Sequence, residues 1–344
     1  MKPSRKLLVV GPSWVGDMVM AQSLFIALKD QYPLCQIDVL APKWTLALLA
    51  KMPQVQHAIA LPTARGQFGL IQRYQLGRRL RSEHYDQAIV LPNSWKSALV
   101  PFFAYIPVRT GYMGECRWGL LNDARTLDKS VLAMTVQRFV ALAYAKNTAL
   151  PPACPTPCFV SDNSKQHATA LKFQLNLNLK ILVLCPGAEY GEAKRWPISH
   201  FAELAKQTAA QGWQIWLLGS DKDSAIAEQI NHAAGNVCRN FAGHTSLTEA
   251  VELMALADAI VSNDSGLMHV AAALDKDIVA LYGSSDPSFT PPLSKKAHII
   301  SLQLACSPCF KRECPLYPPE HESHTQCLTN ITPDRVLTVL STIH

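Results

Sequence analysis

The sequence predicts an α/β protein of two doubly wound halves, each with a mostly parallel sheet, facing one another across a cleft. Three observations predict this fold class. Short apolar runs alternate with longer amphipathic stretches, a proline-rich segment interrupts the alternation near the middle, and the alternation then restarts. The length of 344 residues also fits two domains, since a single core rarely grows past about 250 to 300 residues.

The first half begins with a buried strand at residues 6–10, because the run Lys-Leu-Leu-Val-Val is short and is closed by Gly-Pro. Similar short runs, each followed closely by proline, predict further strands, and the stretches between them have helical spacing of apolar residues. The expected strands are 37–40, 58–61 and 88–91, and the expected helices are 18–29, 68–81 and 131–144.

Residues 147–163 contain four prolines in close succession and predict an interdomain linker, since proline at this density continues neither a helix nor a central strand. The alternation after it predicts strands at 181–185, 214–218, 259–262 and 278–282, with helices at 199–211, 224–234, 247–255 and 266–274. A last helix is expected at 333–343, with Thr332 as N-cap and Pro333 in the first position.

Composition narrows the class of protein. Hydrophobic residues make up 49% of the chain and charged ones 17%, which excludes a disordered chain. The apolar run at 7–10 stops at Gly11-Pro12, too short for a secretion signal or a spanning helix, so a cytoplasmic protein is expected. Residues 1–150 carry 18 Lys+Arg and 8 Asp+Glu, a charge of +10, and the remainder carries −4. This asymmetry points to a polyanionic partner, either nucleic acid or a phosphorylated lipid or saccharide. A solvated surface with a chance bias of charge is the alternative, and charge alone does not decide among these interpretations.

In open parallel sheets, ligands bind beyond the carboxyl ends of the strands, so the strand-to-helix junctions are the candidate sites. The first junction, Gly-Pro-Ser-Trp-Val-Gly-Asp at 11–17, places Asp17 at a helix start, as a general base or only as a helix cap. It contains neither G-x-G-x-x-G nor a P-loop, so a dinucleotide redox site or a P-loop ATPase has no support.

Three junctions of the second half carry polar and basic residues. Lys194 follows the strand at 181–185 through a glycine-containing loop, and Asp221 follows the strand at 214–218. Ser265 and Gly266 open a helix after the strand at 259–262, so their backbone N–H groups predict an anion site. His269 lies one turn into that helix and is expected to help neutralise a diphosphate.

Four of the ten cysteines fall within 22 residues, in the spacing Cys306-x2-Cys309-x4-Cys314-x12-Cys327. The C-x2-C knuckle is typical of structural zinc sites, but the rest of the spacing is irregular. A reduced loop without metal is the favoured interpretation, and zinc is the alternative.

The ordered motifs resemble the ADP-heptose:lipopolysaccharide heptosyltransferases, a family of inverting glycosyltransferases with the two-Rossmann-domain GT-B fold. The resemblance runs over nearly the whole chain. It rests on the motifs at 11–17, Leu-Pro-Asn-Ser-Trp-Lys-Ser-Ala at 91–98, Arg-Thr-Gly-Tyr at 109–112, Cys-Pro-Gly-Ala-Glu-Tyr-Gly at 185–191, Lys-Arg-Trp-Pro at 194–197, Asn-Asp-Ser-Gly-Leu-Met-His at 263–269 and Phe-Thr-Pro-Pro-Leu-Ser at 289–294.

The resemblance implies an acceptor-binding domain at 1–160, an ADP-sugar-binding domain at 161–330, and a C-terminal helix at 331–344 that packs back toward the first domain. It implies transfer of L-glycero-D-manno-heptose from its ADP form to the first heptose of the lipopolysaccharide inner core, with inversion and without an essential divalent metal. Asp17 is the implied base. The implied donor-binding residues are Gly187, Lys194, Asp221, Thr245, Asp264, Ser265, Gly266 and His269, and the implied acceptor-binding residues are Ser13, Trp14, Gly16, Asn93, Lys96, Arg109 and Arg117.

The implied acceptor is a phosphorylated heptosyl-Kdo2-lipid A at the cytoplasmic face of the inner membrane, so peripheral membrane contact is expected. Three aromatic residues, Phe102, Phe103 and Tyr105, are candidates to touch lipid. The cations expected to meet phosphates and anionic lipid are Arg65, Arg73, Arg78, Arg79, Arg81, Lys96, Arg109 and Arg117.

Three alternatives remain open. One is a related enzyme of the same fold, either another inner-core heptosyltransferase or a nucleotide-sugar epimerase. The second is a non-catalytic protein that binds nucleotide sugars or phosphoglycolipids. A nucleic-acid binder is disfavoured, because no basic–aromatic motif or helix-turn-helix spacing is present and the second half is acidic.

Overall fold

The computed structural model describes residues 5–63 and 66–343, which form two compact units that divide between Val160 and Ser161. Each unit is an α/β domain built on a six-stranded, entirely parallel sheet. The predicted fold class, two doubly wound α/β domains of the GT-B type, is therefore confirmed for the architecture of each unit.

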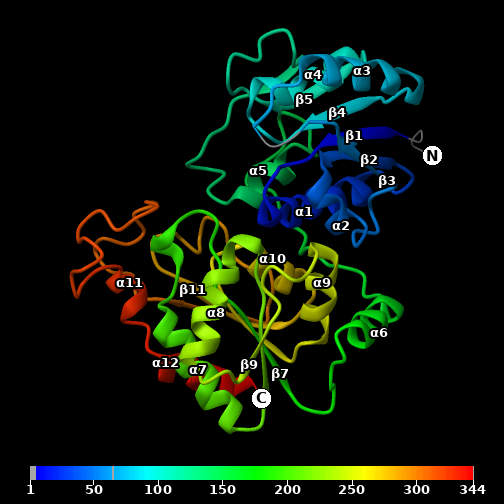
Figure 1. The fold of residues 1–344 in the computed structure, drawn as a ribbon. Helices are drawn as coiled ribbons and strands as arrows, with labels where there is room; N and C mark the ends of the chain where they lie inside the picture. Colours follow the sequence, from blue (N-terminus) through cyan, green and yellow to red (C-terminus); the bar gives the residue numbers. More distant parts are fainter. Residues whose placement is uncertain (1–4, 64–65, 344) are drawn as a thin grey trace. The chain divides into compact units, whose positions relative to one another are not determined.

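The sheet of the first unit has the strand order β3-β2-β1-β4-β5-β6, the doubly wound order of Rossmann domains. The order reverses between β1 and β4, so the crevice expected to bind ligands lies at the carboxyl ends of these two strands. Figure 1 shows α1 and α5 on one face of this sheet and α3 and α4 on the other. The elements are β1 (Lys6–Val10), α1 (Val15–Gln31), β2 (Gln36–Pro42), α2 (Leu46–Leu49), β3 (His57–Leu61), α3 (Leu70–Leu80), β4 (Gln87–Val90), α4 (Leu99–Phe103), β5 (Val108–Tyr112), β6 (Asp123–Arg125) and α5 (Thr135–Ala141).

The second unit repeats this plan, with the order β12-β11-β10-β7-β8-β9 and a reversal between β7 and β10. Helices α7, α8 and α12 pack together, and α6, α9 and α10 form a second group (Figure 1). The elements are α6 (Asn163–Lys172), β7 (Ile181–Cys185), α7 (Ile198–Ala210), β8 (Gln214–Leu217), α8 (Ser224–Ala233), β9 (Cys238–Asn240), α9 (Leu247–Leu256), β10 (Ala259–Asn263), α10 (Gly266–Ala273), β11 (Asp277–Tyr282), β12 (Ala297–Ser301), α11 (Gln326–Thr329) and α12 (Pro333–Ile343).

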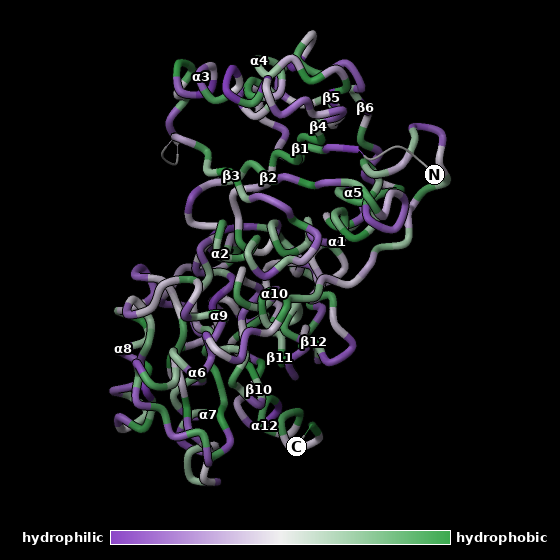
Figure 2. The backbone as a smooth tube through the Cα atoms, turned by 90° about the vertical axis from the view of Figure 1, so that its right-hand side faces the viewer, coloured by the Kyte–Doolittle hydropathy of each residue, from purple (hydrophilic) through white to green (hydrophobic). Residues whose placement is uncertain are grey.

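Each unit closes its own hydrophobic core, and the central strands are its most apolar part. The tube of β10 and β11 is largely green in Figure 2, in keeping with the almost complete burial of these strands. In the second unit, Trp196 and Phe201 pack edge to face with ring centroids 4.9 Å apart. Burial of aromatic side chains of this size stabilises each fold by about 2 to 3 kcal/mol per side chain.

The C-terminal helix α12 belongs to the core of the second unit. Val336 and Leu340 are buried against that core, and α12 packs on α7 and β11. The apolar stripe of α12 is thus used within the second unit, and the expectation that residues 331–344 pack back toward the first domain stays a prediction. The predicted cap is confirmed, since the backbone N–H of Arg335 donates to Thr332 Oγ1 at 3.3 Å.

The proline-rich connection is fastened to the first unit by two fully buried polar residues of α1. Ser23 Oγ donates to the carbonyl of Pro155 at 2.6 Å. Gln22 donates to the Cys158 carbonyl at 2.6 Å and accepts from the Cys158 N–H at 3.0 Å. The connection ends one residue earlier than the predicted range 147–163, because the Asp162 carboxylate caps α6, which begins at Asn163.

Candidate functional site

The carboxyl edge of the second sheet is held together by the buried side chain of Asn263, the last residue of β10. Its Oδ1 accepts from the backbone N–H of Trp196 at 3.0 Å, and its Nδ2 donates to the carbonyl of Pro186 at 2.8 Å. One carboxamide thus joins the loop after β7 to the end of β10, across the reversal in strand order. In the sequence analysis Asn263 is named only as part of the motif at 263–269. The signal that could have identified it is a polar residue at the end of an otherwise apolar strand.

Lys194 and Asp264 form an ion pair at this edge, Nζ to Oδ2, with their side chains only 16% and 6% exposed. The ammonium group also lies 5.1 Å from the centroid of the Tyr190 ring, a favourable cation–π distance. Carboxylate and ring together fix the position of the cation. The structure therefore brings together Lys194 and Asp264, two of the sequence-predicted site residues, and assigns the carboxylate a positioning role.

The N-terminus of α10 follows directly. Ser265 is the N-cap in extended conformation, and its side chain makes no capping hydrogen bond but lies 3.3 Å from Ser262 Oγ. The backbone N–H groups at the start of the helix, from Gly266 onward, are therefore not capped by that side chain. A helix start of this kind attracts anions through its N–H groups and its dipole.

His269 lies within the same helix and is 5% exposed. Burial lowers the pKa of its imidazole to about 4; Asp264 opposes this shift and Lys194 adds to it. At neutral pH this burial keeps the ring uncharged, and the expectation that it helps neutralise a diphosphate stays a prediction. A neutral imidazole can still donate a hydrogen bond to a phosphate oxygen.

The buried, neutral His269 predicts a pH-dependent stability of the second unit. An unfolded histidine titrates near pH 6.5, so between pH 6.5 and about 4 the unfolded chain binds the proton that the folded chain excludes. Stability is therefore lost as pH falls through this window, by up to about 3 kcal/mol from this group. Urea unfolding at pH 7 and pH 4.5 should show a smaller loss for His269→Asn than for the parent chain. Replacing the exposed His244 in the same way should leave the pH dependence intact, and an equal loss in all three proteins would contradict the assignment.

Gly187 lies where the loop after β7 approaches Asp223. A Cβ at position 187 would come 2.5 Å from Asp223 Cγ, so a side chain there would displace this carboxylate. The Asp223 carboxylate accepts from the N–H and the hydroxyl of Ser220 at 2.9 and 2.7 Å. It thereby shapes the loop that carries the exposed Asp221.

Thr245 lies on the following loop of the same edge, half-buried, with its hydroxyl 3.3 Å from the carbonyl of Phe241. The two loops are joined by a hydrogen bond from the Gly243 N–H to the Gly219 carbonyl at 3.3 Å. Asp221 and Thr245 therefore belong to the edge that holds Lys194, on the loops that follow the neighbouring strands β8 and β9.

In the first unit, the loop after β1 places Asp17 in the first turn of α1, half-buried, with Trp14 as the N-cap residue. Gly11 allows close packing here, since a Cβ at that position would come 2.6 Å from Met18 Cε. The Ser13 carbonyl accepts from Trp44 Nε1 at 3.1 Å, which fixes the middle of the loop. The predicted acceptor residues of this loop are divided by exposure: Ser13 and Trp14 are exposed and Gly16 is buried.

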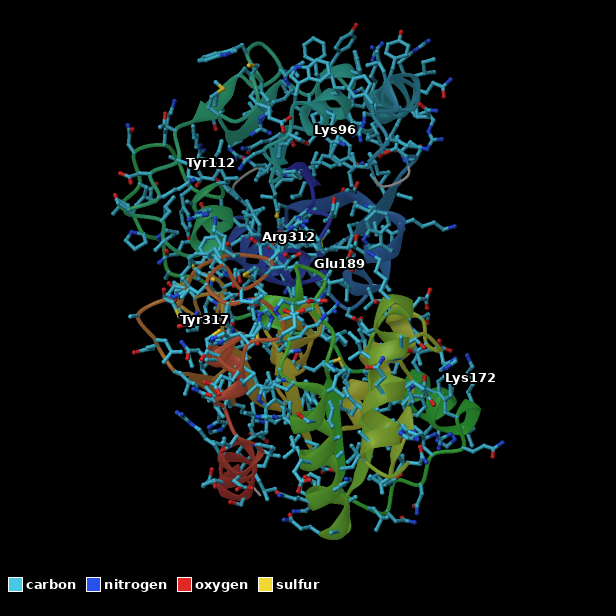
Figure 3. The ribbon with its side chains drawn as sticks, turned by 60° about the vertical axis from the view of Figure 1, so that its left-hand side comes forward. Lys96, Tyr112, Lys172, Glu189, Arg312 and Tyr317 are labelled. Atoms are coloured by element: carbon cyan, nitrogen blue, oxygen red, sulfur yellow. The ribbon has the colours of Figure 1, made fainter. Side chains whose placement is uncertain are left out.

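Asn93 and Lys96 follow β4, the neighbour of β1, so both predicted residues lie at the same carboxyl edge as Asp17. Lys96 and Tyr112 are labelled in Figure 3. Arg117 requires correction as an acceptor-binding residue, because it is 0% exposed. Its guanidinium donates to the carbonyl of Pro92 at 2.7 Å and to that of Tyr112. Arg117 therefore holds the loop after β4 from inside.

Arg109 is also engaged internally. It lies near the amino end of β5, opposite Ala88 in the ladder. Its Nε donates to the carbonyl of Leu120 and its Nη1 to that of Ile106, both at 2.6 Å. The first bond ties β5 to the loop that follows it and the second to the residues before it. Arg109 is half-buried, and its expected acceptor contact stays a prediction.

The basic residues expected to meet a membrane are not equally available. Arg73 is 4% exposed and donates to three partners, among them the carbonyls of Phe68 and Lys96, so with Arg117 it is withdrawn from that role. Arg65 lies outside the described residues. Arg78 and Arg79 are exposed on α3, and Arg81 stacks over the Tyr105 ring at 3.8 Å.

Exposed apolar side chains surround these cations. We call this surface the α3–α4 face. Phe103 is only half-buried and packs edge to face on Tyr74 with centroids 5.2 Å apart, so it supports the face from beneath. The members of the face are Phe68, Leu70, Ile71, Tyr74, Arg78, Arg79, Arg81, Phe102 and Tyr105.

Within residues 5–63 and 66–343, no group of three or more His, Cys, Asp or Glu side chains is placed so that it could hold a metal ion. Cys306, Cys309, Cys314 and Cys327 nevertheless line one small cavity.

The chain is similar to known proteins along nearly all of its length. The family model described as glycosyltransferase family 9 (heptosyltransferase) matches residues 73–319. Lipopolysaccharide heptosyltransferase 2 of Salmonella typhimurium and that of Escherichia coli are each 48% identical to it, and lipooligosaccharide heptosyltransferase 2 of Haemophilus ducreyi is 50% identical. Each alignment covers 98% of both chains.

Solved structures show the same similarity as the sequence relatives. The structure of the E. coli ADP-heptose lipopolysaccharide heptosyltransferase II superimposes with a TM-score of 0.84 at 45% identity, over 98% of each chain. A family 9 glycosyltransferase from Veillonella parvula has the same TM-score at 17% identity, covering 100% of this chain and 98% of its own, and shows the shared fold.

Proposed function

Since the chain belongs to glycosyltransferase family 9, the heptosyltransferase family, we propose that it transfers heptose from ADP-heptose onto the inner core of lipopolysaccharide. In finer terms, L-glycero-D-manno-heptose is transferred with inversion to the first heptose of the core. The observation that carries the proposal is the 48–50% identity over 98% of both chains to heptosyltransferases numbered 2.

The second unit supplies the groups that would hold the donor. Negative charge builds on the diphosphate as the bond from the sugar C1 to the phosphate oxygen breaks, and fixed positive groups stabilise it. Lys194 provides a positioned cation, the start of α10 at Ser265 and Gly266 provides N–H donors, and His269 provides a neutral donor. Asp221 and Thr245, on the next two loops, would contact the ribose and the adenine.

The first unit supplies the base. The Asp17 carboxylate would take the proton of the acceptor hydroxyl while that oxygen forms the new bond to C1 from the face opposite the leaving ADP, which departs with the bonding electrons. A single displacement inverts the configuration at C1. None of these steps uses a divalent cation, so turnover is expected to be unchanged when Mg²⁺ or Mn²⁺ is omitted from the assay.

The decisive experiment offers the purified protein ADP-heptose together with acceptor cores that carry no, one or two heptoses. Product formed only with the one-heptose core supports the finer proposal. Transfer to a heptose-free core would instead identify a different inner-core heptosyltransferase, and donor isomerisation without transfer would identify an epimerase. Donor binding without any turnover would identify a non-catalytic binding protein.

The acceptor is an anionic glycolipid, and we propose that the α3–α4 face contacts the membrane that contains it, at the cytoplasmic side of the inner membrane. No helix in the described part of the chain is long and apolar enough to span a bilayer. Ile71 and Tyr105 are 69% and 70% exposed, beside the exposed Arg78 and Arg79. Aromatic and apolar side chains next to cations are typical of surfaces that bind anionic leaflets.

The α3–α4 face predicts charge-dependent binding to vesicles. Each cation near an anionic leaflet contributes about 1 kcal/mol, so Arg78→Ala/Arg79→Ala should lower the partition coefficient onto phosphatidylglycerol vesicles about 30-fold at low salt. Cosedimentation measures this directly. Lys206→Ala, which removes an exposed cation of the second unit, is the matched control. Equal binding by the three proteins would count against the membrane role of this face, while transfer to a delipidated acceptor would remain a separate test of the enzyme.

A further inference from the structure

One small cavity of the second unit is lined by four cysteines. Cys306, Cys309, Cys314 and Cys327 surround a space of about 20 Å³. That is room for a single water-sized occupant. As they are placed in the described part of the chain, no three or more His, Cys, Asp or Glu side chains could hold a metal ion together, so the four cysteine side chains would have to turn toward the cavity to bind one. The other six cysteines of the chain do not line the cavity.

One observation beyond the four cysteines indicates that the cavity takes a ligand. Ser284 is 1% exposed, lines the cavity, and its hydroxyl has no hydrogen-bond partner among the described residues. A buried hydroxyl without a partner is costly unless something occupies the cavity.

We propose that these four cysteines bind one thiophilic divalent cation, of which Zn²⁺ is the type. Four sulfurs with a C-x2-C knuckle suit the tetrahedral coordination of this ion. On binding, each thiol releases its proton to solvent and its sulfur forms one bond to the metal, with no change of oxidation state.

The neighbouring histidines do not compete for this role. His321 Nδ1 accepts from the Ser323 N–H at 3.0 Å, and His324 Nδ1 is 2.8 Å from the carbonyl of Tyr317. Neither ring lines the cavity. The proposed ligand set is therefore composed of sulfur alone.

The cation would brace the segment that carries Lys194. Between the cysteines, the carbonyl of Phe310 accepts from the Tyr190 hydroxyl at 2.8 Å, and that of Arg312 accepts from the Ala193 N–H at 3.0 Å. A Cβ at Gly191 would come 2.4 Å from the Arg312 carbonyl oxygen, so the two segments pack without space for a side chain. Figure 3 labels Arg312 and Tyr317 of the cysteine-containing loop, and Glu189 of the segment that carries Lys194.

This part of the inference rests on the proposed function, because it assumes that Lys194 contacts the donor diphosphate. The cysteine loop and Asp264 would then hold the lysine segment from two sides. The metal-binding part rests on the four cysteines and the cavity alone, so the two parts can fail separately.

The first experiment measures metal in the full-length protein purified without chelator, by inductively coupled plasma mass spectrometry. About one equivalent of zinc or iron per chain is expected, and replacement by Co²⁺ should give the absorption bands of tetrahedral thiolate coordination. Less than one-tenth equivalent, with four thiols freely titrating or with a disulfide between any two of them by mass spectrometry, would overturn the proposal. None of these readouts depends on heptose transfer.

The second experiment compares Cys309→Ser with Cys116→Ser, which alters an exposed cysteine of the first unit. The first variant should lose the metal and bind ADP at least tenfold more weakly by calorimetry, while the control keeps both. Should Cys309→Ser fail to fold, release of the metal from the parent protein by a mercurial reagent, with ADP affinity measured before and after, replaces it. Metal loss with unchanged ADP affinity would overturn the bracing role.

Discussion

Replacing Asp17 with asparagine is expected to lower kcat about 10²- to 10⁴-fold, the range that a positioned general base contributes. Asparagine has the same shape but cannot take the proton of the acceptor hydroxyl. Asp17 lies in the first turn of α1, where loss of the negative charge also removes about 0.3 to 1 kcal/mol of interaction with the helix dipole, so kcat is measured under conditions where the variant is folded. Transfer from ADP-heptose to a one-heptose core gives kcat, and calorimetry with ADP gives the affinity of the second unit.

The matched control is Asp30→Asn, an exposed carboxylate near the other end of the same helix. It should keep full activity, which shows that removal of a negative charge from α1 is not itself harmful. ADP affinity should be the same in both variants. An unchanged kcat for Asp17→Asn would remove the base from the mechanism and would favour the non-catalytic binding protein.

Lys194→Met is the second substitution with a large expected effect, and it acts on both activity and stability. Loss of a fixed donor to the developing diphosphate charge should lower kcat/KM about 10²- to 10³-fold. The same change leaves the carboxylate of Asp264, 6% exposed, without its ion-pair partner. Breaking a buried pair from one side costs about 3 kcal/mol or more, so urea unfolding should shift in the same variant.

The double variant Lys194→Met/Asp264→Asn separates the two effects. Removal of the buried negative charge should restore most of the lost stability, because the unpaired charge causes the loss. Activity should stay low, since the cation is still absent. Recovery of kcat/KM along with stability would show that Lys194 supports the fold and does not act on the donor.

Sequence reasoning succeeded where proline and glycine mark the ends of apolar runs. Residues 6–10, 181–185 and 333–343 were predicted with the bounds that the structure shows for β1, β7 and α12. These segments are closed by Gly-Pro or Pro-Gly, or opened by Thr-Pro, and such residues restrict the backbone whatever the tertiary context.

Four strands were missed, namely β5, β6, β9 and β12. β6, β9 and β12 are edge strands whose residues include Asp123, Arg125, Arg239 and His298, and β5 lies between β4 and β6. Their pairing with an inner strand, rather than their own apolar pattern, makes them strands, and a single sequence does not show that pairing. The helix α6 was missed for a related reason, since its cap Asp162 lies in the proline-rich segment that predicted a linker.

For the candidate site, the rule that ligands bind beyond the carboxyl ends of parallel strands located the two sheet edges. It did not identify the buried side chains that hold the loops at these edges in place. Arg117 was assigned to an anionic ligand because arginine is usually exposed and binds phosphate. Its actual partners, the carbonyls of Pro92 and Tyr112, come from two loops that only the folded sheet brings together. The bridging bonds of Asn263 likewise connect positions 67 and 77 residues away, beyond what local spacing can indicate.

The connection after residue 146 also has a consequence for recombination. Each half contains a whole ladder of strands and its own apolar interior, so a genetic crossover just after Val160 would sever no strand pairing in either. Chimaeric enzymes made at that point, combining this amino-terminal half with the carboxyl-terminal half of a relative that uses another sugar nucleotide, would inherit two complete folding units. Natural exchange at the same position offers these enzymes a route to new substrate pairs without rebuilding either interior.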